Sequence, residues 1–234
     1  MELNLHYVNV IIPAFNEEDA IAQVIKEIPD EVSDIIVVDN GSTDATYNIA
    51  KAAGATVLKE WKKGYGHACL RGINHCNNKK HPPGIIVFLD GDLSDHPAEM
   101  KRLIQPISQD KADLVIGARI KELREKGSMT FPQKLGNTLA TRLMKMIFPG
   151  SPFTDLGPFR VIKLNQLNAL NMKDKTYGWT VEMQLKVLKK NMTYTEVEMN
   201  YRNRIGTSKV SGTVKGAVMA GVKILGWIFK YSFK

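Results

Sequence analysis

Short apolar runs rich in valine and isoleucine alternate with amphipathic stretches along the first half of the chain. The apolar runs lie at residues 8–12, 34–38, 56–58, 85–89 and 113–116, and helical periodicity marks residues 17–27, 43–53, 66–76 and 97–107. This alternation predicts an α/β domain built on a mainly parallel sheet. The runs are apolar almost throughout, as expected for strands that helices cover on both faces.

Polar, turn-forming segments follow four of the predicted strands. They lie at residues 13–18, 39–46, 90–95 and 117–119. In open sheets of this kind, ligands bind beyond the carboxyl ends of the strands. We therefore expect these four segments to surround a binding site at one edge of the sheet.

The pattern is looser in the second half of the chain. Residues 120–132 are charged and contain glycine, which predicts a mobile loop. We expect a helix at 133–148, a strand at 159–162, a helix at 180–190 and an alternating strand at 194–201. The expected organisation is one domain over residues 1–212, followed by a basic amphipathic helix over residues 213–234.

Length and cysteine content fit a single intracellular domain. The 234 residues suffice for one full core, and the N-terminus lacks the features of a signal peptide, so a cytosolic location is expected. Cys69 and Cys76 lie two helical turns apart, roughly 10 Å, which is too far for a disulfide. They are expected to be free thiols.

The net charge of +8 is confined to the C-terminal end of the chain. Residues 186–234 contain ten lysines and arginines against Glu196 and Glu198, and the charges of the preceding residues sum to zero. The local excess of positive charge favours an anionic partner at the C-terminal end over a generally basic protein.

The stretch IIVFLDGDLSD, residues 85–95, places three carboxylates at the end of an apolar strand. Buried carboxylates are costly unless a cation or hydrogen-bond donors compensate for the lost hydration. Asp90 and Asp92, separated by Gly91, can turn toward one point and supply the hard oxygen ligands that suit Mg²⁺ or Mn²⁺. Asp95 is expected to cap the helix that follows.

Eight segments of the chain resemble, in the same order, the family 2 glycosyltransferases of the GT-A fold. They are IIPAFNEE, IIVVDNGSTDAT, KGYGHACLRGI, VFLDGDLSDHP, DLVIGAR, TDLGPFRVI, YGWTVEMQLKVLKKN and YRNRIGTSK. The resemblance covers most of the chain. It implies a GT-A, Rossmann-like sheet flanked by helices, and an enzyme that uses a nucleotide-diphosphate sugar as donor.

The resemblance also implies a role for individual residues at the donor. Pro13, Phe15 and Glu17 would line the base and ribose, and Asp39 would accept a hydrogen bond from one of them. A divalent ion on the donor diphosphate would be held by Asp90 and Asp92, beside Gly91. Further donor contacts are expected from Lys63 and Gly64, in a loop whose glycines allow a ligand to approach closely.

Within the family, the order of motifs looks most like the polyprenyl-phosphate glycosyltransferases, including dolichyl-phosphate mannose synthases. An acceptor phosphate is already anionic, so it requires cations more than a general base. The candidate cationic and hydroxyl groups are Arg119, Lys134, Arg202, Arg204, Ser208 and Lys209. Two departures from the subgroup leave the acceptor open: Ser94 stands where many members have glutamine, and FPQKLGN offers only Lys134 in a region that often carries an arginine and a serine.

The last twenty residues form a second, independent indication of a membrane acceptor. On a helix, Lys215, Lys223, Lys230 and Lys234 fall within about 100° of one another, and apolar residues fill the remaining arc. The longest uncharged run is only seven residues, so the pattern fits a helix lying on an anionic membrane surface and not one that crosses it. The alternative is a C-terminal helix packed against the domain with a solvated lysine stripe. Nucleic acid is a less suitable partner, because the lysines are interleaved with an apolar arc.

The sequence therefore predicts an inverting, metal-dependent hexosyltransferase that acts on a polyprenyl phosphate at the cytoplasmic face of a membrane, with Asp92 and Arg119 in catalysis. One alternative is a transferase that acts on a hydroxyl of a soluble or glycan acceptor, for which Asp155 or Glu182 would be the base. A further alternative is a non-catalytic protein that binds nucleotide sugars or acts as a membrane scaffold.

Overall fold

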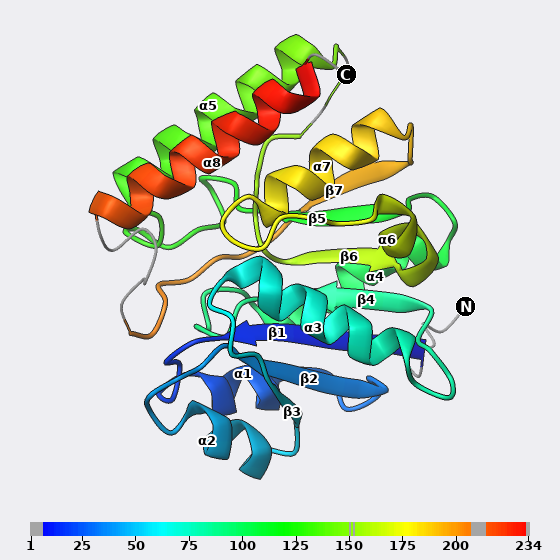
Figure 1. Cartoon of the computed structure of the whole chain (residues 1–234), viewed down its shortest axis with the longest axis vertical. Coiled ribbons are helices and arrows are strands. Elements are labelled where there is room, and N and C mark those ends of the chain that lie inside the picture. Colours follow the sequence, from blue (N-terminus) through cyan, green and yellow to red (C-terminus); the bar gives the residue numbers. More distant parts are fainter. Residues whose placement is uncertain (1–6, 150, 152, 207–213, 233–234) are drawn as a thin grey trace.

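A mixed sheet forms the centre of the computed structural model, which describes residues 7–149, 151, 153–206 and 214–232 (Figure 1). Within these residues the sheet has seven strands in the order β3-β2-β1-β4-β6-β5-β7. All neighbouring pairs are parallel except those that involve β6. The strands are β1 (Val8–Ala14), β2 (Asp34–Asp39), β3 (Thr56–Lys59), β4 (Ile85–Phe88), β5 (Leu114–Ala118), β6 (Arg160–Lys163) and β7 (Tyr194–Glu198).

Helices cover both faces of this sheet, as the apolar strands predicted. They are α1 (Ile21–Glu27), α2 (Thr46–Ala52), α3 (Tyr65–Asn77), α4 (Met100–Ser108), α5 (Phe131–Ile147), α6 (Leu164–Leu170), α7 (Trp179–Lys189) and α8 (Val214–Ser232), with a short 3-10 helix η2 (Pro97–Glu99) before α4. One core packs α1, α2 and α4 against the sheet, and the other packs α3, α5, α6, α7 and α8 against the opposite face. Cys69 and Cys76 are buried free thiols in the second core, as expected.

The elements differ from the predicted ones mainly at their ends. The first helix begins at Ile21 and not near residue 17, because Asn16 has a positive φ of 54° and a turn precedes the helix. The last strand ends at Glu198, and Tyr201 then forms a single parallel bridge with Arg124. Helix α6 was not predicted.

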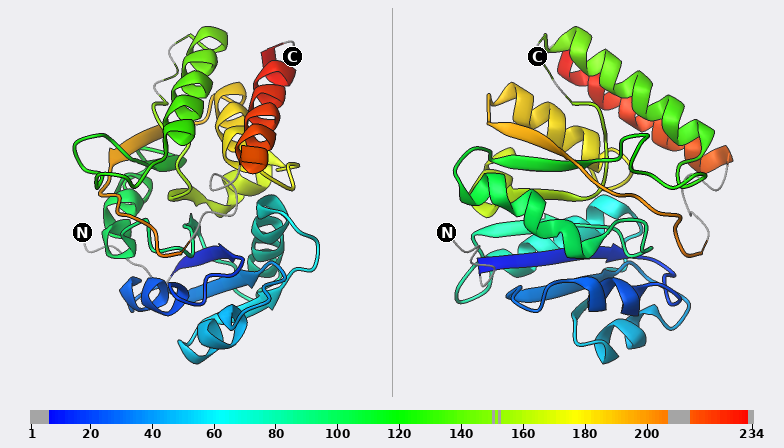
Figure 2. Two further views of the ribbon diagram at one scale, coloured as in Figure 1. Left: turned by 90° about the vertical axis from the view of Figure 1, so that its left-hand side faces the viewer. Right: turned by 180° about the vertical axis from the view of Figure 1, so that it is seen from behind.

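Helices α5 and α8 lie side by side at one end of the molecule, next to α7 (Figures 1 and 2). α8 packs on the domain through Trp227 and Ile228, which are buried, while Val222 and Phe229 on its other side are exposed. Helix α8 therefore has one packed face and one apolar outer face. In the described part of the chain, no helix is long and apolar enough to cross a bilayer. The expected boundary at residues 212 and 213 lies outside the described residues.

The anchor of α8 is a buried carboxylate in the loop before α7. The indole Nε1 of Trp227 donates to Asp174 Oδ2 over 2.6 Å, and Lys223 Nζ lies 3.3 Å from the same oxygen. The other oxygen accepts from the backbone amides of Thr176 and Gly178. Burial alone would raise the pKa of Asp174, but these hydrogen bonds and the Lys223 charge lower it. Asp174 therefore fixes the loop and the helix to each other.

Candidate active site

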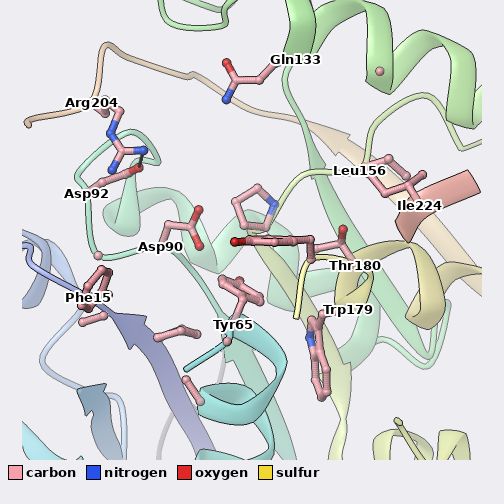
Figure 3. Close-up of a pocket in the computed structure, with 18 of the residues that line it drawn as sticks. Phe15, Tyr65, Asp90, Asp92, Gln133, Leu156, Trp179, Thr180, Arg204 and Ile224 are labelled. Carbon is pink, nitrogen blue, oxygen red and sulfur yellow. Dashed lines mark ion pairs between the residues drawn. The ribbon is translucent and has the colours of Figure 1, made fainter. Parts of the chain in front are cut away.

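A cavity of about 530 Å³ opens at the carboxyl edge of the parallel strands, where the sequence placed its binding site. Figure 3 shows Phe15, Asp90, Asp92 and Arg204 on one side of it, and Leu156, Thr180 and Ile224 on the other. Nine of the predicted donor and catalytic residues line it together with Arg204: Pro13, Phe15, Glu17, Lys63, Gly64, Asp90, Gly91, Asp92 and Arg119. The cavity thus joins segments that are far apart in the sequence.

The two aspartates after β4 lie in this cavity in different environments. Asp92 Oδ1 accepts from the backbone amide and the hydroxyl of Ser94, over 2.9 and 2.5 Å. Asp90 Oδ1 is buried and has no hydrogen-bond partner among the described residues. Burial, with the nearby Asp92 charge, raises the pKa of Asp90 to about 7. Asp90 thus has an unsatisfied oxygen that lacks a cation or donor.

These carboxylates suit a hard divalent ion. Mg²⁺ and Mn²⁺ prefer oxygen ligands, and Mg²⁺ is commonly bound by one or two carboxylates together with substrate phosphates and water. The described residues contain no group of three or more His, Cys, Asp or Glu side chains with metal-site geometry. The chain therefore fits an ion that shares its coordination with a bound diphosphate.

Arg204 is the cation that faces the carboxylates in this structure. Its Nη1 lies 3.1 Å from Asp92 Oδ2, and its Nη2 donates to Glu17 Oε1 over 3.2 Å. The sequence assigned Arg204 to the acceptor phosphate, and the structure brings it to the carboxylates of the predicted donor site. A guanidinium here can bind a phosphate group from either substrate.

An amide network positions the loop that carries Lys63. Asn40 Nδ2 donates to the carbonyls of Glu60 and Lys62 over 3.0 and 2.8 Å, and its Oδ1 accepts from Gly64 N over 2.7 Å. A carboxylate at position 40 could not make the two donations. Lys63 Nζ lies 3.8 Å from the centre of the Phe15 ring, which places both side chains at one wall of the cavity.

The glycines of this loop serve a purpose that the sequence did not indicate. A Cβ at Gly64 or Gly66 would lie 2.2 Å from the carbonyl oxygen of Lys175 or Asp174, respectively. Gly64 also has a φ of +140°. The close approach that requires glycine is therefore to the loop before α7, although Gly64 still lines the cavity.

Arg119 is held by a buried ion pair at the end of β5. Its Nε and Nη2 donate to the two oxygens of Asp155 over 2.8 and 2.6 Å, and its backbone amide also donates to Asp155. Burial would raise the pKa of Asp155, but the charge and hydrogen bonds of Arg119 lower it. The guanidinium also lies 5.2 Å from the centre of the Tyr201 ring. Asp155 thus orients Arg119, and a low pKa makes this carboxylate a weak base.

Glu182, the other candidate base, is buried away from the cavity. Its carboxylate accepts from the backbone amides of Lys173 and Asp174 and pairs with Lys186 over 2.6 Å. It is not among the residues that line the cavity. These contacts give Glu182 a structural role in holding the loop before α7, and they leave it poorly placed to accept a proton from a substrate.

Several other predicted residues are also not part of the cavity lining. Arg202 donates to the carbonyl of Leu93 and pairs with Glu27 over 2.7 Å, so it clamps the loop after β4. Asp39 is buried and accepts from Ser42 N, beside Asn40, which does line the cavity. Lys134 is exposed in the first turn of α5, outside the cavity lining. Ser208 and Lys209 lie outside the described residues.

Asp95 is not the helix cap that the sequence predicted. His96 precedes η2, and no side chain caps that helix. Asp95 is instead buried, and its Oδ2 finds no partner among the described residues. Burial and the charges of Asp90 and Asp92 raise the pKa of Asp95 well above its usual value. Asp95 is therefore coupled electrostatically to the carboxylates of the cavity.

Sequence reasoning missed an aromatic wall and the arginine that supports it. Tyr65, Trp179 and Tyr201 line the cavity, and each lies inside a quoted motif without having been assigned a role. Arg160 is fully buried and donates to the carbonyls of Gly157 and Thr180, which ties the loop before β6 to the first turn of α7. Burial lowers the pKa of Arg160 to about 10. The aromatic residues within the motifs were the only signal that could have revealed this wall.

A mainly parallel sheet, a carboxylate pair at its edge and cations facing that pair define a glycosyltransferase with the GT-A fold. The chain belongs to glycosyl transferase family 2, whose sequence model matches residues 9–165. The family assignment drawn from the eight motifs is therefore confirmed, as is enzymatic transfer of a glycosyl group.

Two curated relatives illustrate the range of similarity. An uncharacterised glycosyltransferase of Mycobacterium tuberculosis is 29% identical over 216 residues, which cover 91% of this chain and 94% of that protein. A UDP-N-acetylglucosamine–dolichyl-phosphate N-acetylglucosaminyltransferase of Methanococcus voltae is 32% identical over 167 residues, which cover 62% of this chain and 64% of that protein.

A solved structure shares the fold over almost the whole chain. Glucosyl-3-phosphoglycerate synthase from Mycobacterium tuberculosis, in complex with Mn²⁺, uridine-diphosphate-glucose and phosphoglyceric acid, superposes with a TM-score of 0.77. The match covers 97% of this chain and 79% of that one at 22% identity. The similarity confirms the predicted GT-A fold.

Proposed function

We propose that this glycosyltransferase moves a hexose from a nucleotide-diphosphate sugar to a polyprenyl phosphate, with inversion at the anomeric carbon. The observation that carries the proposal is the division of the cavity. One side holds the carboxylates Asp90 and Asp92 with the cation Arg204, the other includes the apolar residues Leu156 and Ile224, and Arg119 also lines the cavity. An amphiphile with an anionic head fits such a cavity.

The cavity also lacks an evident general base on its apolar side. Among the described residues that line it, the carboxylates are Glu17, Asp90 and Asp92, all at the donor side, and there is no histidine. A phosphate monoester does not need a base, because it is anionic near neutral pH. A hydroxyl acceptor would need one.

The residues of the chain have complementary roles in this reaction. Phe15, Glu17 and Lys63 would bind the nucleoside, and Arg119 would lie between the donor and acceptor phosphates. Asp155 would keep the Arg119 guanidinium in one orientation, so that an acceptor oxygen is positioned opposite the leaving diphosphate. The residue 120–132 loop would cover the bound substrates.

Asp90 and Asp92 would hold Mg²⁺ or Mn²⁺ against the donor diphosphate. When bound, the ion neutralises the negative charge that develops on the leaving phosphates. Asp92 stays hydrogen-bonded to Ser94, which fixes its orientation. Two similar proteins support a metal and a lipid acceptor: the solved synthase binds Mn²⁺, and the Methanococcus voltae enzyme uses dolichyl phosphate.

We further propose that the enzyme binds peripherally to the cytoplasmic face of a membrane through α8. The outer face of this helix exposes Met219, Val222, Leu225 and Phe229, and lysines flank it. An apolar face beside cationic side chains is typical of helices at an anionic lipid surface.

A soluble acceptor is the alternative, favoured by the likeness to a synthase whose acceptor is a phosphoglycerate. On that alternative Asp155 or Glu182 would be the base. Asp155→Asn or Glu182→Gln, whichever residue is the base, would then abolish turnover while donor binding stays normal. For the lipid phosphate, we expect Glu182→Gln to reduce stability, and its pH–rate profile to keep the shape of the wild type.

A screen of donors and acceptors tests the proposal. Purified enzyme with Mn²⁺ is assayed for nucleotide release from several nucleotide sugars, with farnesyl phosphate, farnesol, 3-phosphoglycerate or no acceptor. We expect release to depend on farnesyl phosphate and on the metal. Turnover with 3-phosphoglycerate and none with farnesyl phosphate would contradict the lipid acceptor, and no turnover with any acceptor would favour a binding or scaffolding protein.

A further inference from the structure

A second cavity lies between α5 and α8, beyond the candidate active site. Its volume is about 460 Å³, and it is lined by Leu143, Ile147, Leu225, Gly226, Ile228 and Phe229. All six are apolar, and none belongs to the nucleotide or metal site. Leu225 and Phe229 are exposed at the outer surface, so this cavity opens to the surroundings of the protein.

The two cavities share the same pair of helices. The active-site cavity reaches Gly136 near the start of α5 and Gly221 in the first half of α8. The apolar cavity uses the C-terminal halves of both helices. Because the helices run in the same direction along each other (Figure 1), the seam between them leads from one cavity toward the other. The distance from Gly136 to Ile147 along α5 is about 16 Å.

Two glycines lie where the seam begins. Gly136 and Gly221 both line the active-site cavity, and a Cβ built on either residue would meet no atom within 4 Å. Glycine is unfavourable inside a helix, and it is usually explained there by tight packing. Tight packing does not explain these two residues, since a larger side chain would enter free space.

We propose that the α5–α8 seam binds the isoprenoid chain of the lipid acceptor. Its phosphate would lie near Arg119 and Arg204, its first units would pass Gly136 and Gly221, and its continuation would lie along Leu143, Ile147 and Phe229. This assignment rests on the proposed polyprenyl-phosphate acceptor. It also provides a route from the active site to the exposed apolar face, where the rest of a long chain would remain in the bilayer.

The chemistry of the seam distinguishes this occupant from a polar acceptor chain. Cationic side chains line the active-site cavity but not the far one, whose six residues offer no side-chain hydrogen-bond donor or acceptor. An unbranched or branched hydrocarbon needs no such partner and gains from leaving water. A sugar or a peptide acceptor would lose hydrogen bonds to water in the same place.

Chain-length dependence tests the assignment by direct binding. The full-length protein is titrated with dimethylallyl, geranyl and farnesyl phosphates, below their micellar concentrations, by isothermal calorimetry with UDP and Mn²⁺ present. We expect the Kd to fall at least tenfold from the five-carbon to the fifteen-carbon ester in the wild type. In Gly221→Leu and Gly136→Leu, this fall in Kd should shrink to less than threefold, because leucine would fill the seam.

Thr138→Leu is the matched control. It adds a leucine to the same helix two residues from Gly136, about 200° around the axis, where Thr138 is exposed. It should keep the wild-type chain-length gradient. Circular dichroism and UDP affinity report whether the glycine variants fold, which is expected because leucine favours helix more than glycine does.

The outcomes of these titrations distinguish a failure of the seam assignment from a failure of the proposed function. Equal affinity for all three esters, or an undiminished gradient in both glycine variants, would overturn the seam and leave the lipid-phosphate acceptor standing. Absence of binding for every ester would overturn both. Photo-crosslinking with a diazirine-bearing farnesyl phosphate adds a positional readout: labelled peptides should come from α5 and α8, and labelling confined to other elements would refute the assignment.

Discussion

At position 40, a single side-chain atom decides whether the residue can hold the neighbouring loop in place. No role was predicted for Asn40 from the sequence. The structure shows that the amide nitrogen is needed for two hydrogen bonds to the loop carrying Lys63, while the amide oxygen receives Gly64 N. The position of the loop that carries Lys63 therefore depends on a donor that aspartate lacks.

Asn40→Asp should destabilise this loop. The variant loses two donated hydrogen bonds and places a carboxylate beside two carbonyl oxygens, at a cost of about 1–3 kcal/mol for each group left unsatisfied. We expect a lower free energy of unfolding in urea and weaker UDP binding. Thr43→Ala, in the same strand-end region, is the control. An unchanged midpoint for Asn40→Asp would show that the loop does not depend on these contacts.

The raised pKa of Asp90 predicts an unusual dependence of stability on pH in metal-free protein. The folded pKa is about 7, above the ordinary value of 3.8, so the folded state binds more protons between these limits. Stability should therefore fall as pH rises from about 4 to 7. Asp90→Asn, which cannot ionise, should be more stable than the wild type at pH 8 and nearly equal to it at pH 4.

Urea unfolding with EDTA at several pH values measures this difference. Adding Mn²⁺ should reverse the order at pH 8, because the ion stabilises ionised Asp90 in the wild type alone. A variant that is less stable than the wild type at pH 8 in EDTA would contradict the raised pKa.

Helix α8 is the element whose position the sequence described least well. Its lysine sector and apolar arc were visible as a periodic pattern, but both a membrane-facing helix and a packed helix could produce it. In the structure α8 is packed on one side, where Trp227 faces the domain, and Phe229 faces outward on the other. The deciding contact joins Trp227 to Asp174, 53 residues away.

Long-range contacts of this kind explain what sequence could and could not predict. Alternating strands and helices fix the order of β1 to β5, because their signals are local. The Asp90 and Asp92 pair was identifiable because both residues lie within one motif. By contrast, the pairing of Arg119 with Asp155 spans 36 residues, and its effect on the candidate base follows only from the fold. The same holds for Glu182, which accepts from two backbone amides of the loop before α7.

Trp227→Phe should loosen α8 without unfolding the domain. The substitution keeps an aromatic ring but removes the hydrogen bond to Asp174, at a cost of about 1–3 kcal/mol. Hydrogen exchange should show faster exchange in α8 and in residues 174–178, with strand amides unchanged. Phe229→Leu, on the exposed side of α8, should leave exchange in residues 174–178 as in the wild type.

At the scale of the whole molecule, apolar surface gathers where α5 and α8 meet. Phe131, Leu135 and Met146 of α5 are 76%, 58% and 77% exposed, and Phe229 of α8 is 65% exposed. The two helices lie at one end of the molecule (Figure 2), and both carry exposed apolar side chains. Large exposed apolar areas usually mark an interaction surface, and the C-terminal excess of positive charge favours an anionic membrane.

The double variant Leu135→Gln/Met146→Gln should weaken binding to anionic liposomes. Full burial of such a side chain contributes about 1.5–3 kcal/mol, and partial insertion of two should account for about a tenfold loss of affinity. Co-sedimentation with phosphatidylglycerol vesicles measures this. Trp61→Gln removes a 74% exposed aromatic side chain beyond β3, at the other end of the sheet, and should have no effect. Equal losses in both variants would argue against a defined docking face.

The loop of residues 174–178 contacts both the segment that carries Lys63 and the helix α8. Its carbonyls lie against Gly64 and Gly66, and its Asp174 holds α8. Thermodynamic reciprocity then applies: if seating α8 on a bilayer tightens the nucleotide site by some factor, nucleotide binding must strengthen membrane attachment by the same factor. Enzyme with bound nucleotide would then remain at the membrane, and enzyme without it would be released more readily. The time spent at the membrane would in this way follow the turnover of the enzyme.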